Sequence, residues 1–188
     1  MRRADRILFE TPAGFDDPLE MLLGCHRRIE RQLETLKRLR LHVEERGVDP
    51  EASTAAQSIL KYFAKSALHH HDDEEKDVFP LLGVRIADPG EKARFAKFRE
   101  TLEADHRRLD AAWHRLRRPL EGIAEGLRRQ LPEADVREFV EGYAHHILTE
   151  EHALAEFVNR WLNDEDRGTL GRSMAARRSV PWPPRPPG

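Results

Sequence analysis

The chain of 188 residues is long enough for one domain with a buried core, although length alone also allows two small domains. Its 32 basic and 34 acidic side chains give a formal net charge of -2, so no overall field favours nucleic acid or an anionic membrane. The single cysteine, Cys25, excludes an internal disulfide, and no apolar run reaches the roughly 18 residues of a membrane span. Residues 1–18 contain no apolar stretch long enough for a signal peptide. We therefore expect a cytoplasmic protein with no nucleic-acid or membrane partner.

Helix boundaries are well marked in the sequence. An aspartate followed by proline recurs three times, and this pair supplies an N-cap side chain and a proline at the first helical position. A glycine and a Phe-Pro step are typical of helix ends. The starts are Asp17-Pro18, Asp49-Pro50, Asp88-Pro89 and Pro132-Glu133, and the ends are Gly47 and Phe79-Pro80. These signals predict four long helices, over about residues 18–46, 50–78, 89–117 and 133–162.

Four shorter segments remain. Residues 119–131 begin with a proline, and two alternatives stay open for them: a kinked continuation of the third helix or a short separate helix. Residues 164–178 are expected to form a short fifth helix. Residues 1–15 form an N-terminal extension. Residues 179–188 contain five prolines, so they are expected to be an extended, disordered tail or a segment that docks on a groove of a partner.

Each predicted helix carries one apolar stripe with steps of three and four residues, and a histidine interrupts every stripe. The stripe of the second helix, for example, runs through Phe63, Ser66 and His70. On the second and fourth helices a glutamate follows the histidine by one turn. The interrupting residues are His26, His70, Glu74, His106, His146 and Glu150. Short connections between amphipathic helices predict an all-α, up-down-up-down four-helix bundle.

The sequence also contains an internal repeat. Residues 26–30, HRRIE, resemble residues 106–110, HRRLD, and residues 69–75 resemble residues 145–151 when His70 is aligned with His146. The separation of the two matched histidines is 44 residues in the first half and 40 in the second. The chain therefore reads as two similar helical hairpins that face each other.

The six interrupting side chains suit a metal site. A lone histidine on an apolar face is usually a hydrogen-bonded core residue, but two glutamates buried among leucine and phenylalanine would each cost several kcal/mol unless they are protonated or neutralised. Histidine and glutamate four residues apart lie about 5–6 Å apart at Cβ and can converge on one centre. Four imidazoles and two carboxylates favour iron, manganese or zinc over calcium or magnesium.

The number of donors favours two ions. Six protein donors are too many for one tetrahedral ion and too few for two six-coordinate ions. Two ions about 3.5–4 Å apart, bridged by carboxylates and a water-derived oxygen, would keep open positions for a small molecule.

Other candidate residues receive simpler interpretations. Several histidines are expected to be solvated or to lie behind the ligands, and these are His69, His71 and His145. Three more are expected on the surface: His42, His114 and His152. The second glutamate of each motif, Glu75 or Glu151, points about 100° away from the first. The remaining residues, Tyr62, Tyr143 and Cys25, are expected in the core.

The arrangement of His26, His70-x-x-x-Glu74, His106 and His146-x-x-x-Glu150 resembles the hemerythrin-like proteins with HHE cation-binding motifs. The resemblance covers about residues 16–162 and extends to a domain of residues 16–178. It implies a bundle that holds two iron ions with an oxo or hydroxo bridge and the two glutamates between them. The small ligand it implies is dioxygen, nitric oxide or peroxide. The oxygen carriers of this family have a second histidine where this chain has Asp110, which leaves Asp110 as an open candidate ligand.

Three classes of function follow. The first is a binding protein that senses or sequesters a small ligand or stores iron. The second is an oxidoreductase that removes peroxide or reduces nitric oxide at the same centre. The third, a metal-free interaction bundle, accounts for the helices but not for the histidines and glutamates in their stripes. No dedicated acid, base or organic substrate pocket is visible in the sequence, so a binding protein is favoured over an enzyme.

Overall fold

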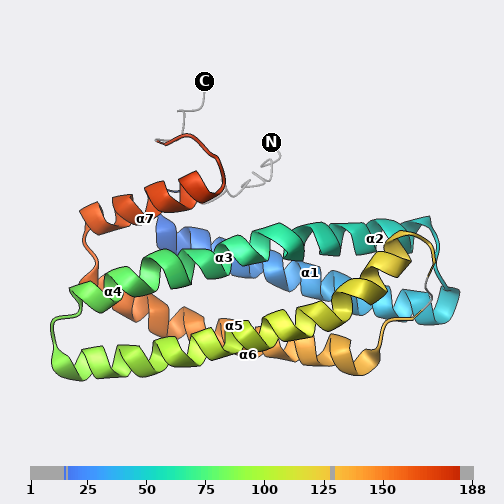
Figure 1. Cartoon of the computed structure of the whole chain (residues 1–188), viewed down its shortest axis with the longest axis horizontal. Coiled ribbons are helices and arrows are strands. Elements are labelled where there is room, and N and C mark those ends of the chain that lie inside the picture. The colour runs from blue at the N-terminus through green and yellow to red at the C-terminus, as the bar shows by residue number, and fades with distance from the viewer. Residues whose placement is uncertain (1–14, 16, 128–129, 183–188) are drawn as a thin grey trace, which may run out of the picture.

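A computed structural model describes residue 15, residues 17–127 and residues 130–182. Within this part of the chain every regular element is a helix, which confirms the all-α prediction. Figure 1 shows the long helices side by side, with consecutive helices running in opposite directions along the long axis. The predicted N-terminal extension, except Phe15, and residues 183–188 of the predicted tail lie outside the described residues.

Local capping fixes the starts of the long helices. Helix α1, Pro18–Arg46, begins where the Asp17 carboxylate accepts a hydrogen bond from the backbone N–H of Glu20 at 3.1 Å. It ends at Gly47, whose φ of 82° lies in the left-handed region that favours glycine. Helix α5, Pro89–Ala124, begins in the same way at Asp88. Helix α6 spans Glu133–Trp161.

The second helix is continuous but irregular. It consists of α2 (Pro50–Lys61), the π-helical turn η1 (Tyr62–Ser66), α3 (Ala67–Asp73), the π-helical turn η2 (Glu74–Val78) and α4 (Phe79–Arg85). The prediction that this helix ends at residue 78 is wrong. In η2 the N–H of Phe79 bonds to the carbonyl of Glu74, five residues back, and this wider turn accommodates Pro80 without ending the helix.

Two further predictions are decided by helix irregularities. The π turn η1 adds a residue, so Ser66 is exposed and Ala67 takes the buried position. The prediction that Ser66 lies on the inner stripe is therefore wrong.

Helix α5 runs through Pro119 to Ala124, so residues 119–124 continue the third helix. A proline inside a helix removes one backbone hydrogen bond, but the apolar neighbours Leu116, Leu120 and Ile123 stay fully buried and hold this turn in place.

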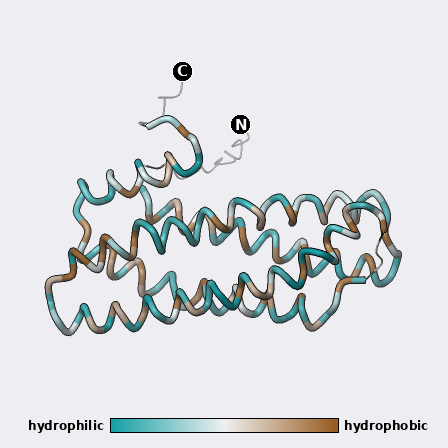
Figure 2. The backbone as a smooth tube through the Cα atoms, in the orientation of Figure 1, coloured by the Kyte–Doolittle hydropathy of each residue, from teal (hydrophilic) through white to brown (hydrophobic). Residues whose placement is uncertain are grey.

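The core has two apolar clusters. One contains Phe63, Trp113 and Phe139, and the other contains Phe79 and Phe157. The histidines and glutamates of the predicted site lie between them along each helix. Figure 2 shows hydrophobic and hydrophilic residues interspersed along every helix, as expected where only one face of each helix is buried. No helix in the described part of the chain combines the length and hydropathy needed to cross a bilayer.

The predicted fifth helix is α7, Asp164–Arg177, which packs against α1, α3 and η2 (Figure 1). The last residue of α7 and the residue after it form ion pairs with a buried aspartate. Arg177 and Arg178 both donate to the carboxylate of Asp73, which is 0% exposed, and Arg177 also donates to Asp77 at 2.7 Å. The C-terminal helix is thereby anchored to the residue that immediately precedes Glu74.

Replacing both Arg177 and Arg178 with alanine should lower the free energy of unfolding by roughly 3–5 kcal/mol, because Asp73 would be left buried without a cationic partner. Urea unfolding of the metal-free protein measures this loss. Arg172→Ala is the matched control, since Arg172 is an exposed arginine of α7 whose side chain donates only to Thr169. Equal stability of the double variant and the control would contradict the anchoring role.

Candidate metal centre

The six predicted donors meet in the interior of the bundle. His26 comes from α1, His70 and Glu74 come from α3 and the start of η2, and the other three are His106 of α5 and the α6 residues His146 and Glu150. All six side chains are buried, with none more than 4% exposed. Four helices therefore contribute donors to one region between the two apolar clusters.

The donors form two groups. In the first, His26, His70, Glu74 and Glu150 each offer a ligand atom, and these atoms all lie within 4.8 Å of one another. The Nε2 of His26 lies 3.1 Å from Oε2 of Glu150, and the Nε2 of His70 lies 3.2 Å from Oε1 of Glu74.

The second group consists of His71, His106 and His146, whose ring nitrogens also lie within 4.8 Å of one another. Both glutamates contact this group as well. Oε2 of Glu74 lies 3.1 Å from His106, and Oε2 of Glu150 lies 3.3 Å from His146. Each carboxylate therefore lies between the two groups of imidazoles.

The buried polar atoms fit a metal better than they fit one another. Both ring nitrogens of His70 and His146, both carboxylate oxygens of Glu74, and Nε2 of His106 are buried and have no hydrogen-bond partner among the described residues. His70 and Glu74 are close enough to bond but lack the required angles. A buried polar atom without a partner costs about 1–3 kcal/mol, so a bound cation would remove several such penalties at once.

The charges of the cluster lead to the same conclusion. Burial raises the pKa of Glu74 well above its usual value, and the nearby charge of Glu150 raises it further. Burial also acts to raise the pKa of Glu150, but His26 and His146 outweigh it and hold that pKa well below its usual value. For His26 burial lowers the pKa, while Glu150 and Glu74 overcome this effect and raise it to about 9. Without an ion, burial and the charge of Glu150 thus favour the protonated form of Glu74, and the two glutamates favour the cationic form of His26.

Three histidines of the two groups, His70, His71 and His146, have a lowered pKa, which favours the neutral imidazole. Burial lowers the pKa of His70 and of His71 well below the usual value, and the neighbouring imidazoles His26 and His106 add to the effect. The pKa of His146 is lowered mainly by burial as well. A neutral imidazole keeps the lone pair that binds iron, manganese or zinc.

The second glutamate of each motif contacts a histidine on a neighbouring helix. Oε1 of Glu75 lies 2.6 Å from Nδ1 of His106, and Oε1 of Glu151 lies 3.1 Å from Nδ1 of His26. A carboxylate that accepts from Nδ1–H fixes the tautomer and directs the Nε2 lone pair toward the centre. From the sequence we predicted only that these two glutamates point away from Glu74 and Glu150, so this contact was missed. The internal repeat could have revealed it, because it aligns Glu75 with Glu151 and His106 with His26.

His71 is the other residue that sequence reasoning undervalued. We predicted a solvated or supporting role, but its Nε2 is buried in the second donor group, and its ring stacks on His106 with centroids 4.0 Å apart. Consecutive helical residues are about 100° apart, so His71 reaches the α5 side of the centre while His70 faces α1. The repeat gave no signal here, because the residue aligned with His71 is Ile147.

Comparison with known proteins agrees with this geometry. The family model described as the hemerythrin HHE cation binding domain matches residues 17–158. The chain belongs to this hemerythrin family. A protein of Haemophilus influenzae described as uncharacterized is 32% identical over 168 residues, which cover 89% of this chain and 94% of that protein. Membership implies cation binding, typically of iron, and the two donor groups are the candidate ligands.

Other candidates lie outside the centre of this hemerythrin domain. Asp110 is exposed, and its carboxylate lies 3.5 Å from His114, so it belongs to neither donor group. His145 and His152 are exposed as well.

The core predictions concern three further residues. Cys25 is buried and Tyr143 packs against Phe63 and Phe139, in agreement with these predictions. Tyr62, predicted in the core, is only partly buried, and its hydroxyl lies 3.4 Å from the Cys25 carbonyl.

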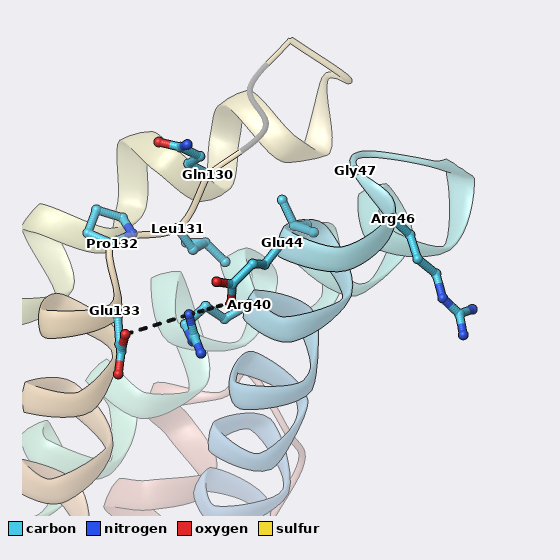
Figure 3. A pocket seen from close by; sticks show the side chains of 9 residues that line it. Arg40, Glu44, Arg46, Gly47, Gln130, Leu131, Pro132 and Glu133 are labelled. Atoms are coloured by element: carbon cyan, nitrogen blue, oxygen red, sulfur yellow. Dashed lines mark hydrogen bonds and ion pairs between the residues drawn. The ribbon is translucent and has the colours of Figure 1, made fainter.

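One recess of the hemerythrin domain is remote from these donors. It has a volume of about 700 Å³ and lies where the end of α1 meets the segment before α6, with Arg40 4.0 Å from Glu133 (Figure 3). Arg40 follows His26 by fourteen residues, a rise of about 20 Å along a helix. The recess therefore has no direct access to the metal centre.

Glu75→Gln and Glu151→Gln should each weaken metal affinity by about 10–100-fold, because each replaces the charged carboxylate that orients a ligand histidine with a neutral amide, which is a weaker acceptor. Competition with a chelator of known affinity measures the change. Glu141→Gln is the control, since Glu141 is an exposed residue of α6 outside both donor groups. Unchanged affinity in both Glu75→Gln and Glu151→Gln would rule out a positioning role.

Proposed function

We propose that this hemerythrin-family protein holds two iron ions and uses them to bind or sense a small ligand, with iron storage as a further use of the same centre. The observation that carries the proposal is the pair of buried glutamates, each in contact with imidazoles of both donor groups. His26 and His70 would hold one ion, and the other would be held by His71, His106 and His146. Glu74 and Glu150 would contribute to both.

The donor set supports iron. Five imidazoles and two carboxylates are too rich in nitrogen for calcium or magnesium, and two ions that share carboxylates are a common arrangement for redox-active metals. The contacts of α1 with α2 and α6, and of α5 with α2 and α6, also support the up-down-up-down four-helix bundle in which such centres are built.

The two halves of the centre differ, and this difference supports a small ligand. One group offers three imidazoles and the other only two, so the protein supplies fewer donors to the ion beside His26 and His70. Ile147, which the repeat aligns with His71, is apolar and buried at 6% exposure. An apolar residue in place of a sixth imidazole favours a compact ligand of low charge, such as dioxygen, nitric oxide or peroxide. When bound, the iron pair supplies the ligand-binding and redox chemistry, while the protein orients the imidazoles and excludes water.

Protein reconstituted with ferrous iron without oxygen should bind close to two ions per chain, and addition of nitric oxide or dioxygen should change its visible absorption. His106→Ala should lose iron, because it removes a donor that contacts Glu74. His114→Ala should keep the full iron content, since His114 is an exposed residue of the same helix. Iron content and absorption spectra are the measurements.

Two results would contradict the proposal. One is a well-folded protein that takes up no stoichiometric iron on reconstitution. The other is equal iron content in His106→Ala and His114→Ala, which would move the centre away from α5. Sustained turnover of hydrogen peroxide by the iron-loaded protein would instead favour an oxidoreductase at the same centre.

A further inference from the structure

A recess of about 330 Å³ is lined by none of the candidate metal donors. Cys25 and Arg28 of α1, Tyr62 and Lys65 of η1, and Arg178 at the end of α7 contribute to its lining. Three parts of the chain that are far apart in sequence therefore meet around one cavity. Its volume falls in the range of about 300–1,000 Å³ that is typical of small-molecule sites.

The recess is cationic. Arg28, Lys65 and Arg178 line it, and no carboxylate does. Arg178 is balanced by Asp73, to which it donates at 2.6 Å. The guanidinium of Arg28 donates to the sulfur of Cys25 at 3.0 Å, and within the described part of the chain no carboxylate oxygen lies within 4.0 Å of Arg28 or Lys65. Arg28 and Lys65 thus have no carboxylate partner within ion-pair distance in the described part of the chain.

Residues with hydroxyl groups also line the recess. Tyr62 and Ser66 belong to the lining, and both are in the π turn η1. The Tyr62 hydroxyl donates to the Cys25 carbonyl at 3.4 Å, which leaves the exposed Ser66 as the neutral donor. The extra residue in this turn is what moves Ser66 off the inner stripe and exposes it. Single π turns inside α-helices occur frequently at functional sites, because they redirect side chains that a regular helix would place elsewhere.

We propose that this recess binds a small oxyanion of the phosphate type. The planar guanidinium of Arg28 can donate two parallel hydrogen bonds to such a group, Lys65 supplies a point charge, and the Ser66 hydroxyl supplies a neutral donor. Two unbalanced cations favour a dianion over a monoanion by simple charge attraction. The site uses none of the metal donors, so it goes beyond the metal-binding function. Cys25, which lines the recess, directly precedes the candidate donor His26 in the sequence.

Isothermal titration of the full chain with inorganic phosphate tests the site, with acetate and chloride at matched ionic strength as comparison anions. Phosphate should bind saturably and more tightly than either comparison anion. Arg28→Ala and Lys65→Ala should each weaken phosphate binding by about tenfold, since each removes a charge-assisted donor. Arg28→Lys should keep part of the affinity. Arg27→Ala is the control, because Arg27 is an exposed neighbour on α1 outside the lining.

The titration is carried out on metal-free and on iron-loaded protein, which separates the two proposals. If the protein binds phosphate but takes up no iron, the anion site is supported and only the metal proposal is wrong. The anion site is wrong if phosphate binds no more tightly than acetate and chloride. It is also wrong if Arg28→Ala and Lys65→Ala bind phosphate as Arg27→Ala does.

Discussion

Two carboxyl groups in the interior, Glu74 and Glu150, impose the constraint on which the rest of the structure depends. They are 0% and 1% exposed, and a buried carboxylate without a counter-charge costs several kcal/mol. Every helix that crosses this level of the bundle supplies at least one imidazole toward them. In the absence of an ion, burial favours the protonated form of Glu74, and the nearby glutamates favour the cationic form of His26. A pair of divalent ions would supply a counter-charge to both carboxyl groups and bind several of the unpartnered nitrogens and oxygens at the same time.

Three consecutive residues connect the centre to the surrounding helices. Asp73 is bound by Arg177 and Arg178 at the end of α7, Glu74 faces both donor groups, and Glu75 contacts His106 of α5. The η2 turn begins at the middle one of these residues. Because adjacent helical residues point in different directions, one short segment can contact α7, both donor groups and the outer ring nitrogen of His106. The position of Glu74 therefore depends on how α7 and α5 pack against the second helix.

Much of this fold could be predicted from sequence because it depends on local signals. The Asp17, Asp49 and Asp88 caps act within one turn of each residue, and the helix starts are confirmed. The six inward histidines and glutamates were identifiable because a polar residue in an apolar stripe needs a partner. The end of the second helix was not predictable, because π turns at η1 and η2 change which residues are inward and allow Pro80 to stay helical. The roles of His71, Glu75 and Glu151 depend on contacts between helices, which periodicity within one helix does not encode.

The sharing of Glu74 and Glu150 by both donor groups is tested most directly by native mass spectrometry of iron-loaded Glu74→Ala. Loss of a shared carboxylate removes a donor and negative charge from both ions. We therefore expect metal-free protein with no stable one-iron species, while the unaltered chain carries two iron ions. A stable one-iron form of Glu74→Ala would contradict the account, because it would make Glu74 the ligand of a single ion.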